Sequence, residues 1–350
     1  MITGKYPSPI GEITTYRLVN ARGNEVRLSS LGAGITGIDV PDAQGRRADV
    51  VLGYADAADY MDDSACAGKT PGRFANRIAR GRFSLDGTDY TLAVNNPPNA
   101  LHGGPRGFHN VVWQSEERDG AVTFTYHAKD GEEGYPGNMD VSVTYTWSDA
   151  DELTISYRAV TDKPTVVNLT NHAYFNLSGE GAGSCLDHRL TLNCGRWLPA
   201  DDTDIPLGTV APVDGTPMDF TRGKALGKDI STDFYNLKTG KGYNHFFMIN
   251  GWHGDGRLLT AATLDDARSG RRLTVATTQC GVMLYTGNWL ADNRPVGKCG
   301  RRYADYDGVA LECQGAPDAP NQPALPSQVL RPGEVYSHVI RYSFSNIPLR

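Results

Sequence analysis

Five segments of this chain carry an apolar residue at every second position, and this alternation limits the folds that the chain can adopt. Successive side chains of a strand point to opposite faces of a sheet, so the pattern is typical of antiparallel strands with one buried face. The predicted strands are residues 122–126, 141–147, 153–160, 272–278 and 335–344. No stretch sustains the i, i+3, i+4, i+7 apolar spacing of a helix. The sequence therefore predicts an all-β fold.

Turn-forming residues separate the predicted strands. The chain contains 40 Gly and 20 Pro, which suits many short strands joined by tight turns. Asp86-Gly87 predicts a hairpin between residues 83–85 and 90–92, because this pair readily takes the positive φ angles of a tight turn. Residues 230–256, rich in Gly, Asn and Tyr, are expected to form a loop. No linker, charge block or repeat divides the chain, so we predict that residues 1–350 form a single domain, a large antiparallel β-sandwich.

The distribution of charge and of apolar residues excludes two classes of partner. The net charge is −6, and Lys and Arg are scattered, so no basic track is present that would neutralise the phosphates of a nucleic acid. The first 20 residues lack the apolar core of a signal peptide, and no apolar run approaches the roughly 20 residues of a membrane-spanning helix. We expect a cytoplasmic protein that binds neither nucleic acid nor membrane.

The cysteines give no sign of a disulfide framework or of a metal site. All six are far apart, no Cys-x-x-Cys pair occurs, and the chain is long enough to bury a core without covalent links. A nucleophilic thiol would need an adjacent base, which is missing. We expect reduced thiols at Cys66, Cys185, Cys194, Cys280, Cys299 and Cys313.

Two of the eight histidines stand among small or amide-bearing neighbours. His102 lies in Leu-His-Gly-Gly and His172 in Asn-Leu-Thr-Asn-His-Ala-Tyr-Phe-Asn-Leu, and each could titrate near neutrality. A lone histidine more often satisfies hydrogen bonds in a turn, but for these two the neighbours favour a functional role. We expect purely structural roles for His109, His127, His188, His253 and His338.

Glu312 ends an apolar run and precedes Gly-Ala-Pro. A strand end that opens onto a loop would bury the carboxyl partly. Burial raises a carboxyl pKa and hydrogen-bond donors lower it, so this position can supply a tuned general base. Taken as an isolated residue, Glu312 is more typical of a strand-end side chain that points to water than of a general base.

Other chemistries lack local support. The chain has no Gly-x-Ser-x-Gly elbow, no phosphate-binding glycine loop before a helix and no His-Glu-x-x-His pair, so acyl transfer, nucleotide use and zinc hydrolysis are not indicated. A pair of carboxylates suited to a glycosidase stays open, because residues distant in sequence can meet in space.

Five segments resemble the aldose 1-epimerase (galactose mutarotase) family, in order along nearly the whole chain. They are GRFANRIARG at residues 72–81, LHGGPRGF at 101–108, NLTNHAYFNL at 168–177, YTGN at 285–288 and LECQGAPDAPNQP at 311–323. The resemblance implies the large antiparallel β-sandwich of mutarotases. It also implies an enzyme that opens and recloses the ring of a free aldose such as galactose or glucose.

The resemblance also implies the roles of individual residues. It makes Glu312 the catalytic base and His172 the catalytic acid. Because an acid and a base suffice for this reaction and the sequence shows no ligand cluster, we expect neither a cofactor nor a metal ion. The implied partner is a monosaccharide, and the protein is either a monomer or a homodimer. The implied sugar-binding residues are Asn76, Arg77, His102, Tyr174, Asn244 and Met283.

Two of these positions depart from the family pattern. In GYNH at residues 242–245, Asn244 stands where the family usually has Asp, and Met283 stands where it usually has Gln. An amide divides its hydrogen bonding between donor and acceptor, and a thioether is a weak acceptor. We therefore expect weaker recognition of galactose, seen as a high KM or as a preference for another aldose such as a pentose. Asn244→Asp with Met283→Gln should then improve the use of galactose.

Two further functions remain as alternatives. A non-catalytic sugar-binding or regulatory protein is suggested by Asn244 and Met283, although Glu312 and His172 argue against it. A carbohydrate lyase or glycosidase on the same fold would need a groove lined with exposed aromatic residues. The five tryptophans of the chain do not suggest such a groove.

Overall fold

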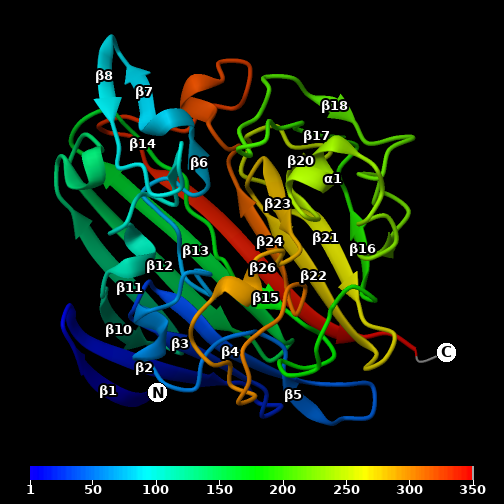
Figure 1. Cartoon of the computed structure of the whole chain (residues 1–350). Coiled ribbons are helices and arrows are strands. Elements are labelled where there is room, and N and C mark those ends of the chain that lie inside the picture. The colour runs from blue at the N-terminus through cyan, green and yellow to red at the C-terminus, as the bar shows by residue number, and fades with distance from the viewer. Residues whose placement is uncertain (349–350) are drawn as a thin grey trace.

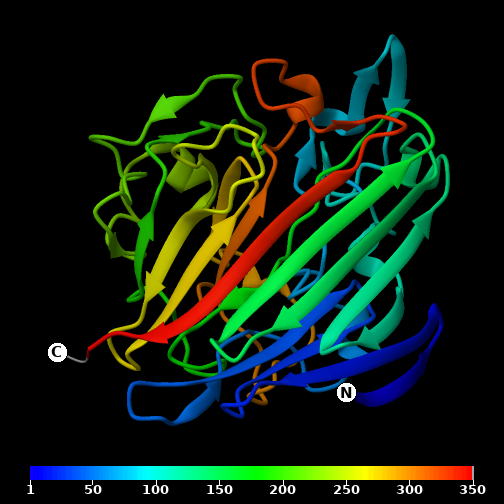
Figure 2. The same cartoon turned by 180° about the vertical axis from the view of Figure 1, so that it is seen from behind.

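Three large antiparallel sheets form the body of the computed structural model, which describes residues 1–348 (Figure 1). The largest has nine strands and joins segments from both halves of the chain. In spatial order these strands are β10 (Gln114–Arg118), β11 (Ala121–Ala128), β12 (Met139–Trp147), β13 (Glu152–Thr161), β26 (Tyr336–Asn346), β22 (Arg271–Thr277), β21 (Leu259–Asp265), β16 (Arg189–Leu192) and β19 (Lys224–Ala225). Figure 2 shows β26, near the C-terminus, running between β13 and β22.

The other two large sheets have five and six strands. The five-stranded sheet follows sequence order: β1 (Ile2–Ser8), β2 (Gly11–Val19), β3 (Glu25–Ser29), β4 (Gly34–Pro41) and β5 (Arg47–Asp49). The six-stranded sheet has the order β15 (Tyr174–Phe175), β24 (Val309–Gln314), β23 (Gly281–Tyr285), β20 (Asn244–Met248), β17 (Arg196–Trp197) and β18 (Ala211–Pro212).

Shorter elements connect the sheets. Three two-stranded pairs are β6 (Arg77–Ile78) with β9 (Ala100–Leu101), β7 (Arg82–Leu85) with β8 (Thr88–Thr91), and β14 (Thr165–Val166) with β25 (Val329–Leu330). Within residues 1–348 the α-helical structure is α1 (Tyr235–Thr239), and no helix there has the length and apolar character needed to cross a membrane. The 3-10 turns are η1 (Asp59–Met61), η2 (Ala79–Gly81), η3 (Phe108–Asn110), η4 (Glu132–Gly134), η5 (Leu290–Asp292) and η6 (Ala319–Asn321).

The main core lies where the five- and six-stranded sheets pack against the nine-stranded sheet. Tyr16 of β2 meets Phe124 of β11 edge to face, with ring centroids 5.9 Å apart. Phe175 of β15 meets Tyr342 of β26 in the same way at 5.1 Å. Such aromatic pairs add to the free energy gained by burying the apolar surface. The fold is the large antiparallel β-sandwich expected from the sequence.

All five strands predicted from the apolar alternation are present, as β11, β12, β13, β22 and β26. Along β13 buried and half-buried residues alternate, which is the pattern of a strand with one face on the core. The predicted hairpin is β7–β8, and Asp86 and Gly87 at its turn have φ angles of 50° and 80°.

The expectation of a loop across residues 230–256 is wrong. This stretch contains α1 and β20, and β20 pairs with β17 and β23 in the six-stranded sheet. The segment that forms β20, NHFFM, is too short to show a convincing alternation, and its buried residues face both sides of a covered sheet. Asn244 therefore begins a strand instead of lying in a loop.

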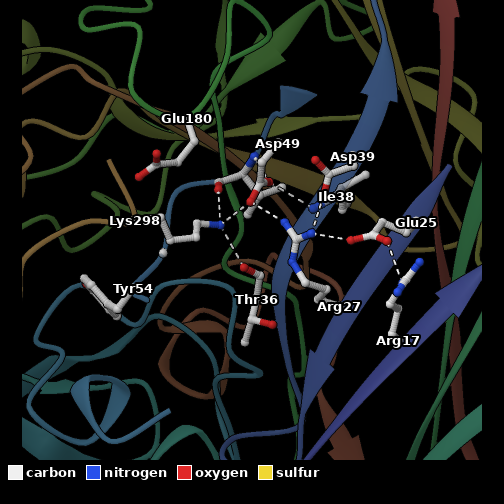
Figure 3. A network of polar contacts seen from close by, with 12 residues as sticks. Arg17, Glu25, Arg27, Thr36, Ile38, Asp39, Asp49, Tyr54, Glu180 and Lys298 are labelled. Atoms are coloured by element: carbon white, nitrogen blue, oxygen red, sulfur yellow. Dashed lines mark hydrogen bonds and ion pairs between the residues drawn. The ribbon is translucent and has the colours of Figure 1, made fainter. Parts of the chain in front are cut away.

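A network of charged residues joins the five-stranded sheet to the segment that follows η5 (Figure 3). Asp49 of β5 accepts hydrogen bonds from Arg27 of β3 and from Lys298. The ammonium of Lys298 also donates to the carbonyl oxygens of Thr36 and Val51, at 2.8 Å each. Several partly buried charges that share hydrogen bonds hold a loop better than an isolated surface ion pair does. The network thus fixes the loop that continues from the rim of the cavity described next.

Candidate active site

A cavity of about 200 Å³ lies against the six-stranded sheet, on the face that points away from the main core. Its lining comes from segments that are far apart in the sequence: β6, β9, β15, β20, β23, β24 and the loops beside them. Seven of the eight site residues expected from the sequence line it: Asn76, Arg77, His102, His172, Tyr174, Asn244 and Glu312. The cavity therefore gathers polar groups from five separate stretches of chain.

The alternation of β24 explains why Glu312 faces this cavity. Val309, Leu311 and Cys313 pack into the main core, so the residues between them point to the opposite face. The loops that cover this face leave Glu312 only 2% exposed, and its Oε2 has no hydrogen-bond partner within the described chain. Burial raises the pKa of the Glu312 carboxyl, while the nearby His172 and Arg77 lower it in part. The expected partial burial at a strand end is wrong, because Glu312 lies inside β24 and is fully buried.

His172 stands directly beside Glu312. Its Nε2 lies 3.5 Å from Glu312 Oε2, and both side chains are buried. The backbone of His172 is fixed on both sides, because its N–H donates to the Lys69 carbonyl and its own carbonyl accepts from the Gly68 N–H. Tyr174 packs against the imidazole with ring centroids 5.0 Å apart. A buried carboxyl and a buried imidazole are thus held next to each other before any ligand binds.

His102 contributes a hydrogen-bond donor to the cavity. Its Nδ1 accepts a hydrogen bond from the Asn76 N–H at 3.1 Å, so the hydrogen of the neutral ring resides on Nε2. Desolvation in the cavity wall and the neighbouring His172 hold the pKa of His102 well below its ordinary value, which keeps the ring neutral. Both Asn76 and His102 adopt left-handed φ angles, 66° and 53°, and the pairing of β6 with β9 holds them.

Arg77 brings a fixed positive charge to the same wall. Its Nε donates to Asn96 Oδ1 and its Nη2 lies 3.0 Å from Asp204 Oδ2. The side chain is only 12% exposed, so its charge acts through a medium of low polarity. Glu312, His172, His102 and Arg77 thus bring a carboxyl group, two imidazoles and a guanidinium around one small space.

Comparison with known proteins identifies the family of the chain. The sequence profile of the aldose 1-epimerase family matches residues 14–343. The chain belongs to this family. Its resemblance to the family, inferred above from five short segments, is thereby confirmed.

Characterised relatives and solved structures agree with the assignment to the aldose 1-epimerases. The galactose mutarotases of Rattus norvegicus and Homo sapiens are each 43% identical over 344 residues, covering 98% of this chain and 97% of theirs. The aldose 1-epimerase of Escherichia coli K12 is 38% identical over 335 residues, covering 94% and 95%. An aldose epimerase homologue from C. elegans superposes with a TM-score of 0.87 at 31% identity, covering 95% of this chain and 99% of that one.

Tyr174, Asn244 and Met283 differ in how they meet the epimerase cavity. The Tyr174 hydroxyl donates to the Ala65 carbonyl at 2.9 Å, so this residue offers mainly its ring to a ligand. Asn244 lines the cavity from the start of β20. Met283 does not line it: the side chain lies in an apolar cluster that includes Phe246, although Met283 pairs with Glu312 across two strands. The geometry gives no support for a contact between Met283 and a sugar.

Several lining residues were not singled out from the sequence as site residues. They are Ser64, Ala65, Cys66, Asn96, Leu101, Tyr285, Trp289 and Leu290. Trp289 is 43% exposed at the cavity, and the Lys241 ammonium lies 5.0 Å from the centre of its ring. The motif YTGN, which ends directly before Trp289, is the sequence feature that could have indicated this part of the lining. The segment around Ser64 carries no comparable motif.

Among the cysteines and the histidines expected to be structural, all of them within residues 1–348, Cys66 lines the cavity and the others do not. All six cysteines are free thiols, as expected, and burial raises the pKa of Cys66 well above its ordinary value although it lines the cavity. His188 is buried, with Nε2 accepting from the Leu177 N–H. His109 packs beside His102 with ring centroids 6.2 Å apart and is not part of the lining.

The donor atoms of His102, His172 and Glu312 lie within 4.8 Å of one another, a spacing that a metal ion could bridge. A metal ligand must offer a lone pair from the imidazole nitrogen. The Nδ1 lone pair of His102 is engaged by Asn76, and Nε2 carries the hydrogen, so this ring presents a donor to the cavity. The set is therefore better matched to the hydroxyl and ring oxygens of a sugar than to a cation.

Proposed function

We propose that Glu312 and His172 are the base and the acid that interconvert the two anomers of an aldose in this cavity. The protein is an aldose 1-epimerase, an isomerase that interconverts the α and β forms of a free sugar. One observation carries the assignment of residues. The anomeric oxygen O1 and the ring oxygen O5 are both bonded to C1, so groups acting on them must stand side by side, as Glu312 and His172 do at 3.5 Å.

The reaction starts with Glu312 ionised and His172 protonated. Glu312 removes the proton from the O1 hydroxyl, and the electron pair left on O1 forms the C1=O1 double bond. The C1–O5 bond breaks, and O5 takes its electron pair and the proton of His172. Rotation about C1–C2 then presents the other face of the aldehyde. The O5 hydroxyl attacks that face, His172 recovers its proton, and Glu312 returns a proton to O1.

Neighbouring residues hold the oxygens during these transfers. The Nε2–H of neutral His102 is placed to donate to an oxygen near C1, where negative charge develops as the proton leaves. Arg77 supports the ionised form of Glu312 and the same developing charge. Asn76 fixes the His102 tautomer through its backbone N–H, and Tyr174 packs against His172. Together these contacts keep the acid, the base and the donors in a single arrangement.

The apparatus is small, and the reaction needs no more. A correctly placed acid or base typically contributes about 10² to 10⁴-fold in rate. Free sugars already mutarotate slowly in water, so two such groups suffice without a cofactor. Because the relatives are named galactose mutarotase and aldose 1-epimerase, we propose a hexose such as galactose or glucose as substrate.

The alternative functions are less well supported. A non-catalytic sugar-binding protein would not need a buried carboxyl paired with a histidine. A lyase or glycosidase that acts on a polymer would need an extended groove, whereas this cavity is about 200 Å³. Among the Tyr and Trp residues that line it within residues 1–348, only Trp289 is exposed.

Two broader properties belong to the same proposal. We infer a single domain, because one core cluster joins residues from Tyr16 to Phe344 and the nine-stranded sheet combines both halves of the chain. We also infer a cytoplasmic location, which is supported by the six free thiols, because cysteines stay reduced in the cytosol.

Polarimetry tests the proposed activity. Freshly dissolved α-D-galactose or α-D-glucose should reach its equilibrium rotation faster when the protein is present, in proportion to the amount of protein added. Dialysis of the protein against EDTA before the assay should leave this rate unchanged. A rate equal to that of buffer alone, for both sugars, would contradict the proposal.

The fall of kcat/KM at low pH should reflect protonation of Glu312. The base acts in its ionised form, so activity falls as pH drops through its pKa. Because burial raises this pKa above the ordinary 4.5, kcat/KM should begin to fall at a higher pH than an exposed glutamate would give. Arg77→Gln should move this fall in activity to a still higher pH, because the charge of Arg77 lowers the pKa of Glu312. Initial rates between pH 4 and 8, corrected for the uncatalysed reaction, provide the measurement, and a fall in activity only at or below pH 4.5 would contradict the assignment.

A further inference from the structure

Asp204, which no sequence motif marks, stands directly behind the cavity wall. It lies in a tight loop in which Asp201 Oδ1 accepts hydrogen bonds from Thr203 and from the Ile205 N–H. The Thr203 carbonyl accepts from Asn99 Nδ2 at 3.1 Å, which ties the loop to the segment before β9. Asp204 itself has a left-handed φ of 63°. The loop therefore presents the Asp204 carboxyl in a defined direction.

That carboxyl contacts two residues that line the cavity. Asp204 Oδ2 accepts a hydrogen bond from Asn244 Nδ2 at 3.0 Å and lies 3.0 Å from Arg77 Nη2. The side chains of Arg77 and Asp204 are 12% and 20% exposed, so solvent screens their attraction only weakly. Burial raises the pKa of Asp204, while Arg77 and the Asn244 amide favour its ionised form. Asp204 thus provides a negative charge one contact away from the sugar site.

The contact with Asp204 decides which end of the Asn244 amide stays free to bind a ligand. An ionised carboxylate only accepts hydrogen bonds, so it selects the amide nitrogen of Asn244 as its partner. The amide oxygen, Oδ1, makes no hydrogen bond to residues 1–348, so it remains available as an acceptor for a ligand in the cavity that Asn244 lines. Polarisation of the amide by the adjacent carboxylate strengthens Oδ1 as an acceptor.

We infer that Asp204 is a positioning residue for sugar recognition, which turns Asn244 into a fixed acceptor for a sugar hydroxyl and holds the guanidinium of Arg77. The carboxylate that is missing at position 244 is thereby supplied from position 204. This inference rests on the proposed function. It replaces the expectation that Asn244 divides its hydrogen bonding between donor and acceptor, and hence that Asn244→Asp improves the use of galactose.

The test compares KM and kcat for galactose in four variants. Asp204→Asn removes the charge at nearly constant shape and should raise KM about tenfold, with a smaller change in kcat, because a charge-assisted contact to the binding residues is lost. Asn244→Asp should also raise KM, because the new carboxylate would face that of Asp204 across the present 3.0 Å contact. The exchange variant Asp204→Asn with Asn244→Asp restores one carboxylate and should recover most of the lost affinity. Asp202→Asn, an exposed charge in the same loop, is the matched control and should change nothing.

The possible outcomes separate this inference from the proposed function. A KM for Asp204→Asn within twofold of the native value, or an exchange variant no better than Asp204→Asn, would overturn the role of Asp204. A merely structural role predicts no recovery in the exchange variant. If Asp204→Asn does not fold, Asn244→Asp decides alone, since an improved KM for that variant overturns the inference. Absence of any activity in the native chain would instead refute the proposed function.

Discussion

Glu312→Gln is expected to lower the rate of anomer interconversion by a factor of about 10² to 10⁴. Glutamine keeps the size of the side chain and cannot accept the O1 proton, so the loss corresponds to about 3 to 5 kcal/mol of transition-state stabilisation. The buried Oε2 of Glu312 has no hydrogen-bond partner in the described chain, so the replacement should not disturb the fold. Polarimetric initial rates at several galactose concentrations, with circular dichroism and thermal melting of the same samples, give the measurement.

A matched control separates loss of the base from loss of a charge. Glu152 in β13 accepts a hydrogen bond from Ser343 on the nine-stranded sheet, away from the cavity. Glu152→Gln should therefore retain native activity. If Glu312→Gln mutarotates galactose at a rate close to that of Glu152→Gln, then Glu312 is not the base.

His172→Gln should reduce kcat by a comparable factor and leave KM within a few-fold of the native value. The acid donates its proton to O5 only as the C1–O5 bond breaks, so its contribution is made in the transition state rather than in the bound sugar. Glutamine can still donate a hydrogen bond to O5 but cannot transfer a proton. Full saturation curves for galactose are needed, because a single concentration does not separate kcat from KM.

The control for His172 is His127, whose side chain is exposed in β11 and contacts Asp140. His127→Gln should behave as the native protein. A His172→Gln enzyme with normal kcat and a raised KM would make His172 a binding residue. The acid would then have to be sought among the other groups of the cavity.

The predictable parts of the fold are the strands in which apolar and polar residues strictly alternate. Strands such as β12 and β13 have one face on the core and one toward solvent. Apolar residues therefore mark the buried face and polar residues the exposed face. β20 and β24 lie in a sheet covered on both sides. Consecutive residues of these strands are buried, so the sequence does not alternate between apolar and polar residues there. The turn at Asp86-Gly87 was predictable because its φ angles favour those two residues.

The residues of the candidate site were predictable where a reactive side chain belongs to a recognisable sequence motif. Glu312 and His172 each stand in a distinctive segment, and the structure brings them together. The burial of Glu312 was not predictable, because loops distant in sequence cover β24. Nor was the contact between Asp204 and Asn244, which are 40 residues apart and meet only through the packing of a loop on β20. Met283 shares a sheet face with Glu312, and only the structure shows that apolar neighbours cover it.

The most direct test of the account is the rate of galactose mutarotation in Glu312→Gln, His172→Gln and the double variant, measured side by side. Groups that act as one unit give losses that do not multiply, because the coupled proton transfer is already broken when either partner is absent. The account predicts that the double variant is slower than the slower single variant by no more than about tenfold. A double variant whose loss equals the product of the two single losses would contradict the claim that Glu312 and His172 open the sugar ring together.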